Sequence, residues 1–264
     1  MKSVLITGAF GGMGRAATKL LASQGYQVFA LDKNIGETEE NVIPVAADIT
    51  SEESVLEALE TVKLHTHKLY ALIHFAGVYM LDSLVEIDDG AFRRIFDVNV
   101  HGAYRVNRAF LPLLEQGSRI LMITSELAPL DPLPFTGIYA VTKAALDKYA
   151  YSLRMELQLL DIHVSVLRAG AVDTGMLDVS TAALDRFCGK TALYACNARR
   201  FRSIVDRVEA RAVPPERIAE KAVGILEKRH PRFVYTVNRN PLLLLMNLLP
   251  KRLQLWVIKQ VLRK

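Results

Sequence analysis

The chain has 264 residues, 51% of them hydrophobic, which excludes a disordered protein and suits one α/β domain. The net charge of +5 is uneven, because nine lysines and arginines and no acid lie between Lys228 and Lys264, which leaves 24 basic against 28 acidic residues elsewhere. A basic tail with leucines and a tryptophan points to a membrane surface and away from nucleic acid.

Apolar β-branched runs alternate with helical patterns along the whole chain. In chain order we predict a strand at 3–6, helix 12–24, strands 27–31 and 42–47, a helix from Ser51, strand 69–75, helix 91–114 with a bend near Pro112, strand 119–124, helix 138–160, strand 163–167, helix 214–229 and strand 233–237. Continuous apolar strands between helices predict a single-domain Rossmann fold, with a doubly wound parallel sheet of about seven strands and helices on both faces.

Two segments depart from this alternation. Residues 176–212 are polar and follow the sixth strand, where ligands bind in such sheets, so we predict a lid over the substrate within a domain of residues 1–240. Residues 241–264 form an apolar and basic tail. Its first apolar run, 242–249, is too short to span a bilayer, and the break at Pro250 disfavours a continuous span. Two interpretations stay open for the tail: an interfacial helix on a membrane, or packing over the substrate pocket or another subunit.

Cysteine content and the start of the chain bear on its location. Cys188 and Cys196 are too few for a disulfide framework and predict reduced thiols. The first apolar run begins at Ser3, so we expect no signal peptide and a cytoplasmic protein, with peripheral membrane contact through the tail. The six histidines show no ligand spacing with acids or cysteines, so we expect no metal.

A glycine-rich turn joins the first strand to the first helix, in the run Thr7-Gly8-Ala9-Phe10-Gly11-Gly12-Met13-Gly14. Glycines there let a pyrophosphate approach the backbone, and the helix beyond offers unpaired N–H groups and a positive dipole end. Asp32 ends the second strand, where a carboxylate accepts hydrogen bonds from ribose and repels a 2′-phosphate. This favours NAD over NADP, although neighbouring Lys33 weakens the argument. Asp48, after the third strand, either faces the adenine or caps the next helix.

Four polar residues follow in the order Asn99, Ser125, Tyr139 and Lys143. A Tyr-x-x-x-Lys pair alone has little specificity, but after a nucleotide-binding turn, with Asn and Ser between, it predicts hydride transfer between a nicotinamide and an alcohol or carbonyl. Lys143 lies one helical turn from Tyr139, and its charge favours the phenolate of a group whose pKa is ordinarily about 10. Tyr139 would then be the acid-base and Ser125 would hold the substrate oxygen.

Together these motifs resemble the short-chain dehydrogenase/reductase family, over residues 2 to about 237. The resemblance implies that Asn99 holds a water linking Lys143 to solvent. It also implies that residues 168–174 form the loop that contacts the nicotinamide, with Thr174 bonded to the carboxamide. We therefore predict a cofactor site made of Gly8, Phe10, Gly11, Gly12, Met13, Gly14, Asp32, Asp48, Ile49, Ala76, Gly77, Asn99, Tyr139, Lys143, Gly170, Val172 and Thr174.

The chain departs from the family pattern at three places. His74-Phe75-Ala76-Gly77 replaces Asn-Asn-Ala-Gly, so the family pattern does not show how the backbone of the fourth strand is supported here. Ala169 replaces a proline, and one extra residue separates Ser125 from Tyr139. None of these changes removes a catalytic group.

The resemblance and the apolar tail predict an NAD-dependent oxidoreductase for a lipophilic secondary alcohol or its ketone, similar to the hydroxysteroid and retinol dehydrogenase branch. Two alternatives are a ketoacyl-thioester reductase of lipid metabolism, which Asp32 disfavours, and a catalytically idle nucleotide-binding protein that docks on membranes. The two long helices predict a homodimer or homotetramer, in which small residues either pack between copies or pack internally. These small residues are Ala103, Ala109, Ala144, Ala145 and Ala150.

Overall fold

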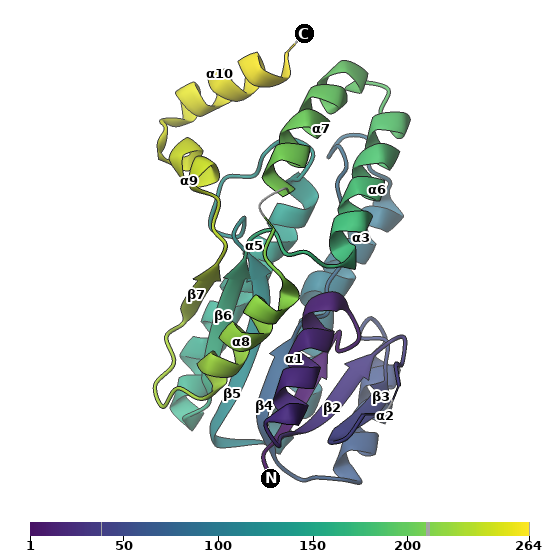
Figure 1. Cartoon of the computed structure of the whole chain (residues 1–264), viewed down its shortest axis with the longest axis vertical. Helices are drawn as coiled ribbons and strands as arrows, with labels where there is room; N and C mark the ends of the chain where they lie inside the picture. Colours follow the sequence, from purple (N-terminus) through teal and green to yellow (C-terminus); the bar gives the residue numbers. More distant parts are fainter. Residues whose placement is uncertain (38, 210–211, 264) are drawn as a thin grey trace.

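The computed structural model describes residues 1–37, 39–209 and 212–263, except for the side chains of residues 175–181 and 205–209 (Figure 1). Its centre is one seven-stranded sheet in the order β3-β2-β1-β4-β5-β6-β7, in which all neighbouring strands are parallel. The strands are β1 (Ser3–Thr7), β2 (Gln27–Asp32), β3 (Val42–Ala46), β4 (Leu69–His74), β5 (Leu114–Ser125), β6 (His163–Ala169) and β7 (Val234–Val237). The predicted doubly wound fold is confirmed.

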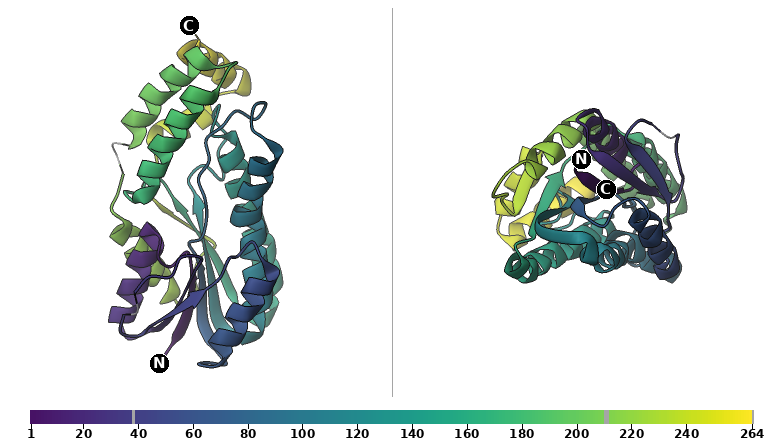
Figure 2. Two further views of the ribbon diagram at one scale, coloured as in Figure 1. Left: turned by 90° about the vertical axis from the view of Figure 1, so that its right-hand side faces the viewer. Right: turned by 90° about the horizontal axis from the view of Figure 1, so that it is seen from below.

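Helices cover both faces of the sheet (Figure 2). On one face lie α1 (Gly12–Ser23) and α8 (Pro215–Leu226), and on the other lie α2 (Glu52–Lys63), α4 (Ala103–Phe110) and α5 (Gly137–Leu157). Alternate residues of each strand point to opposite faces, so Leu5 of β1 packs in one core and Val4 in the other. Ala103 and Ala150 belong to the core against the sheet, so these two small residues serve internal packing.

The region predicted as one helix at 91–114 is composite. It runs through α3 (Asp89–Phe96), a π-helical turn η1 (Asp97–Gly102), α4 and a 3-10 turn η2 (Leu111–Leu113). The predicted bend near Pro112 is wrong, because the helix ends there and β5 begins directly at Leu114, five residues earlier than predicted. The irregular turn lies instead at Asn99, and π-turns of this kind are frequent at functional sites.

The predicted lid and tail are helical. α6 (Gly175–Lys190) and α7 (Ala195–Glu209) stand beyond the carboxyl ends of the strands, and the predicted lid residues 210 and 211 lie outside the described residues (Figure 1). In the tail, α9 (Pro241–Leu248) and α10 (Lys251–Leu262) follow β7, and α10 packs on α7. A third apolar cluster, with Leu81, Phe135 and Phe201, joins these helices to the loops above the sheet.

A chain of buried hydrogen bonds supports β4 at the position where the sequence departs from the family pattern. His74 Nε2 donates to Asn107 Oδ1 at 2.8 Å, and Asn107 Nδ2 donates to the Tyr149 hydroxyl at 3.0 Å, so the chain links β4 to α4 and α5. His74 is 4% exposed. Burial lowers the pKa of His74 to about 4, so the ring is neutral at neutral pH.

We expect His74→Gln to reduce the acid sensitivity of the fold. Above pH 6.5 the His74 ring is neutral in both states, but between about 6.5 and 4 the unfolded chain binds the proton first. The free energy of unfolding of the wild type should therefore fall by about 2 to 3 kcal/mol relative to the variant as the pH drops from 7 to 4.5. Urea denaturation of both proteins measures this, and parallel pH profiles would contradict it.

Candidate active site

The glycine-rich turn is shaped by close backbone contacts. Gly8 has a φ of +67°, and a Cβ there would lie 2.6 Å from the Ala76 backbone nitrogen, so both its conformation and its surroundings require glycine. The Gly11 N–H donates to the Gly8 carbonyl at 3.2 Å. α1 begins at Gly12, and its N-cap residue, Gly11, has no side chain to cap the first turn. The N–H groups and the dipole of α1 are therefore available to an anion.

A cavity of about 1400 Å³ lies against this turn. Twelve of the residues predicted to bind the cofactor line it: Gly8, Phe10, Gly11, Gly12, Met13, Gly14, Asp32, Asp48, Ile49, Ala76, Gly77 and Thr174. Thr174 is brought to the turn by close packing, since a Cβ on Gly12 would lie 2.6 Å from Thr174 Cβ. A glycine turn, a helix N-terminus and a carboxylate in one cavity of this size fit a dinucleotide.

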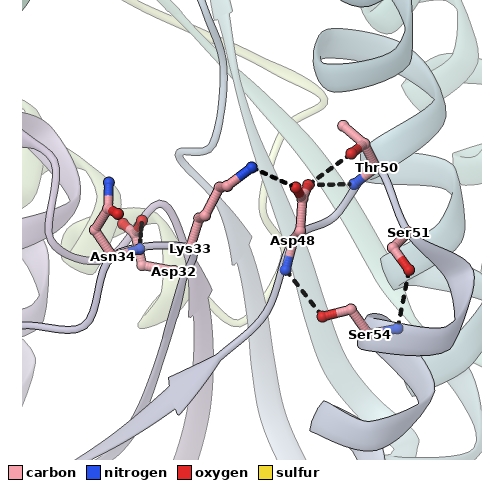
Figure 3. A network of polar contacts seen from close by, with 7 residues as sticks. All are labelled: Asp32, Lys33, Asn34, Asp48, Thr50, Ser51 and Ser54. Atoms are coloured by element: carbon pink, nitrogen blue, oxygen red, sulfur yellow. Dashed lines mark hydrogen bonds and ion pairs between the residues drawn. The ribbon is translucent and has the colours of Figure 1, made fainter.

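Asp32 and Asp48 have different surroundings in this cavity (Figure 3). Asp32 accepts hydrogen bonds from the backbone N–H of Phe10 at 3.0 Å and of Asn34 at 3.2 Å, so its carboxylate holds the glycine turn. Asp48 forms an ion pair with Lys33 at 2.7 Å and accepts two hydrogen bonds from Thr50. These donors lower the pKa of Asp48 to about 2. The lysine charge next to Asp32 is thus engaged by Asp48, which also holds the turn before α2.

Three of the four candidate catalytic side chains meet where β5 ends beside α5. The Ser125 hydroxyl hydrogen bonds the Tyr139 phenol. The Lys143 ammonium lies 5.7 Å from the centre of the Tyr139 ring and donates to the Ile123 carbonyl at 3.2 Å. Ser125 is the last residue of β5, whereas Tyr139 and Lys143 lie on one face of α5. The extra residue between Ser125 and Tyr139 therefore does not separate the two side chains.

Asn99 lies behind this group and lines neither cavity described here. Its Oδ1 accepts from the Val78 N–H at 2.8 Å, and its Nδ2 donates to the Val78 carbonyl and to Thr142 Oγ1. A Cβ on Gly77 would lie 3.3 Å from both Asn99 Oδ1 and Lys143 Nζ. Asn99 therefore fixes the loop after β4, and glycine at 77 leaves Asn99 and Lys143 within reach of one small molecule.

Burial changes the acidity of Tyr139 and Lys143 in opposite directions. It raises the pKa of Tyr139, and the neighbouring Tyr79 adds to the rise while the Ser125 hydrogen bond opposes it. Burial lowers the pKa of Lys143 to about 8. Both shifts disfavour the charged forms, so ionisation of the phenol requires positive charge to be added nearby.

A second cavity, of about 460 Å³, extends from Ser125 and Tyr139 to the underside of the tail. Gly170, Val172 and Lys143 also line it, together with the apolar residues Leu127, Leu133, Pro134, Phe201, Ile204, Leu243, Met246, Val257 and Ile258. The two cavities share Met13, Phe75, Gly77, Val78, Tyr79 and Thr174. Molecules bound in the two cavities would therefore meet beside Tyr139, whose ring centre lies 4.9 Å from that of Tyr79.

Several cavity residues were not predicted from the sequence. Tyr79 follows Gly77 in the loop after β4, and Glu126 is a charged residue placed directly after the buried end of β5, which was a usable signal. Asn240, which caps α9, lines the second cavity together with Leu243 and other tail residues, so the structure places the tail over this pocket. Gly170 packs against the chain leading into the tail, because a Cβ there would lie 1.9 Å from the Asn238 carbonyl oxygen.

Among the described residues, no group of three or more histidines, cysteines and acids is placed to hold a metal ion. No helix in the described part of the chain is both long and apolar enough to cross a membrane.

A model of the short chain dehydrogenase family matches residues 2–185. Among curated proteins, 3-ketodihydrosphingosine reductase of Bacteroides thetaiotaomicron is 24% identical over 231 residues, which are 87% of this chain and 85% of the relative. Estradiol 17-beta-dehydrogenase 2 of Mus musculus is 33% identical over 187 residues, which are 66% of this chain but 49% of the relative, so this chain spans about half of its length.

Solved structures show the same fold. The 3-ketoacyl-(acyl-carrier-protein) reductase from Brucella melitensis, complexed with NADH, has a TM-score of 0.73 at 25% identity and covers 89% of this chain and 96% of its own. A short chain dehydrogenase from Burkholderia cenocepacia in complex with NADP has a TM-score of 0.74 at 21% identity and covers 100% of both chains.

Proposed function

We propose that this chain, which belongs to the short-chain dehydrogenase family, is an NAD-dependent oxidoreductase that interconverts a lipophilic secondary alcohol and its ketone. The observation that carries the proposal is the position of Tyr139, with Ser125 and Lys143, where a nucleotide-sized cavity meets an apolar one. A bound nicotinamide cofactor supplies or accepts the hydride. The protein must hold the substrate oxygen and move one proton.

The three side chains divide that work. Ser125 hydrogen bonds the substrate oxygen and holds it beside the phenol. Tyr139 gives its proton to that oxygen in ketone reduction and takes it in alcohol oxidation. Lys143, with a pKa of about 8, is largely protonated at neutral pH, and its charge offsets the cost of forming a buried phenolate. Asn99, which faces Lys143 across Gly77, holds the water that returns the proton to solvent.

NAD is the cofactor that the surroundings of Asp32 favour. The Asp32 carboxylate stands at the end of β2, within hydrogen-bond distance of the glycine turn, where it accepts from a ribose hydroxyl and repels a 2′-phosphate. Lys33, the cation nearest in sequence, is paired with Asp48 and so does not compensate for this repulsion. Thr174, packed on Gly12, is placed to bond the nicotinamide carboxamide.

A lipophilic substrate follows from the walls of the second cavity. Leucine, isoleucine, valine, methionine and phenylalanine side chains from α7, α9 and α10 line it together with apolar residues of the loops beyond Ser125 and Tyr139. The names of two relatives, a ketodihydrosphingosine reductase and an estradiol dehydrogenase, support an apolar alcohol or ketone. The tail closes the cavity from above, which disfavours a substrate carried on a large thioester-linked partner.

The outer side of the tail supports contact with a membrane. Leu248 of α9 is 81% exposed and Trp256 of α10 is 58% exposed, whereas other residues of the same helices line the cavity. Lys251, Arg252 and Lys259 are exposed on α10, and the tail has no acidic residue. An apolar and basic surface of this kind binds anionic lipid, so a lipid-borne substrate would have a short path to the cavity.

The exposed faces of α4 and α5 support assembly of two copies. Tyr104, Val141, Tyr151 and Met155 are large apolar or aromatic side chains exposed on these two helices. We propose that they pack against the same helices of a second chain in a homodimer, or within a homotetramer.

We expect Tyr139→Phe to lower kcat for the preferred alcohol by about 10²- to 10⁴-fold, because the proton-transferring hydroxyl is lost. NAD affinity should stay within about threefold. The measurement is absorbance of reduced nicotinamide, with a panel of steroid, bile-acid, retinoid and long-chain secondary alcohols. Tyr151→Phe removes a hydroxyl from the exposed side of the same helix and should retain full activity. Wild-type turnover of none of the panel, or full turnover by Tyr139→Phe, would contradict the proposed function.

We expect the wild type to prefer NAD, and Asp32→Asn to raise kcat/KM for NADP relative to NAD by about tenfold or more, because charge repulsion of the 2′-phosphate is removed. Asp48→Asn is a companion variant: Asp48 lines the same cavity and pairs with Lys33, so removing its charge frees Lys33 toward a 2′-phosphate and should shift the preference in the same direction. A smaller change is expected there. A wild type that prefers NADPH would show that the role given to Asp32 is wrong.

We expect the wild type to sediment with vesicles that contain phosphatidylserine and to be released by high salt. Replacing Leu248 and Trp256 together with glutamate should abolish this binding. Leu159→Glu, at an 82% exposed leucine far from the tail in sequence, should not affect it. Equal sedimentation of all three proteins would count against membrane docking through the tail.

A further inference from the structure

Glu126 is a buried acid in a cavity that is otherwise largely apolar. It follows Ser125 directly at the end of β5, lines the second cavity and is 9% exposed. Its Oε2 accepts a hydrogen bond of 2.6 Å from the backbone N–H of Asn240, at the start of α9. Its Oε1 lies over Gly170, 3.1 Å from where a Cβ would stand, and receives no hydrogen bond from the described residues.

A carboxylate in this position lacks hydrogen-bond donors. Burial raises the pKa of Glu126, and only the Asn240 N–H and the charge of Arg239 oppose that rise. Buried polar groups in folded proteins are usually satisfied by a partner, so an acceptor left open toward a cavity is a place where a ligand can supply the donor. The same oxygen would make an entirely apolar ligand less favourable, because it would be desolvated without compensation.

We propose that Glu126 determines specificity by accepting a hydrogen bond, through Oε1, from a second polar group of the substrate. This inference rests on the proposed function and narrows its substrate class. The partner group is a hydrogen-bond donor, either a hydroxyl or a protonated amine, on an otherwise lipophilic alcohol or ketone. Because Ser125 and Glu126 are adjacent, with Cα atoms about 3.8 Å apart, the donor lies within a few carbons of the reacting carbon.

A purely structural role for Glu126 would be to anchor the tail through Asn240. Glu126→Gln separates the two roles, because the amide oxygen can still accept from Asn240 N–H while the amide NH₂ presents donors to the cavity. The anchor is then kept, and the acceptor offered to the substrate is replaced by a donor. Asp131→Asn is the matched control: Asp131 pairs with Lys251 of α10 and so also holds the tail, but it does not line the cavity.

The experiment measures kcat and KM for matched long-chain ketones with NADH. Members of the set carry a hydroxyl, an amino group or only hydrogen within a few carbons of the carbonyl. We expect the wild type to favour one donor-bearing series over the plain ketones by roughly 10- to 100-fold in kcat/KM, and the better series identifies the donor. Glu126→Gln should lose that preference while it retains turnover of the plain ketones, and Asp131→Asn should keep the preference.

The inference is overturned if the wild type shows no preference, if Glu126→Gln keeps it, or if Asp131→Asn loses it equally, which would assign Glu126 to tail anchoring alone. Absence of turnover for every ketone would instead contradict the proposed function. In that case calorimetric titration of the cofactor-bound protein decides, with a long-chain alcohol, diol and amino alcohol as probes. Equal affinities in the wild type, or a preference unchanged in Glu126→Gln, would overturn the proposal.

Discussion

Both cavities depend on the topological switch point between β1 and β4, where the strand order of the sheet reverses. These two strands are neighbours in the sheet, yet the loops that follow them leave in opposite directions, which opens a crevice at their carboxyl ends. The loops stay in contact at their base, because the Phe75 N–H donates to the Thr7 carbonyl at 3.0 Å and Gly8 packs against Ala76. Glycine at position 8 is what permits this approach.

The two cavities lie on different sides of this switch point. The glycine turn leads the chain into α1 and forms the nucleotide side, whereas the loop after β4 forms the boundary with the apolar side. Asn99 lies in a π-helical turn that interrupts regular helix geometry. It fixes this loop through two hydrogen bonds to Val78. The π-helical turn therefore fixes the loop that separates the two cavities, and Tyr79 and Tyr139 lie beside this loop. A side chain at Gly77 would intrude between Asn99 and Lys143.

Ionisable side chains in the interior differ in whether they have an ion-pair partner of opposite charge. Arg168 and Asp147 form a bidentate pair, with Nε–Oδ1 and Nη2–Oδ2 distances of 3.0 and 2.6 Å, and Thr124 donates a further hydrogen bond to Asp147. Lys143 has no carboxylate partner among the described residues, and burial lowers its pKa. The paired charges secure β6 to α5, whereas in the proposed mechanism the unpaired lysine offers its charge to the phenol.

Much of the sheet could be predicted because its strands are buried on both faces and so appear as continuous apolar runs. The glycine turn and the order of Asn99, Ser125, Tyr139 and Lys143 likewise depend on local spacing, which the sequence displays directly. The start of β5 and the π-turn at Asn99 could not be predicted, because they are set by contacts with β4, Val78 and Thr142, which are distant in sequence. Glu126 carried one usable signal, a charge directly after a buried strand, but its contact with the start of α9 depends on a segment that is distant in sequence.

The tail acts on the chemistry by completing the apolar wall. Without α9 and α10 the end of β5 would open to water, and the Ser125 and Tyr139 hydroxyls would exchange their hydrogen bonds with solvent. With the tail in place, Met246 and Ile258 line the space in front of them, so an apolar ligand would displace little water and the proposed proton transfer would take place in a medium of low polarity. A segment that departs from the alternation of strands and helices in the sequence therefore supplies part of the apolar lining of the cavity. Glu126, which accepts a hydrogen bond from the Asn240 N–H at the start of α9, is the acidic exception in this lining.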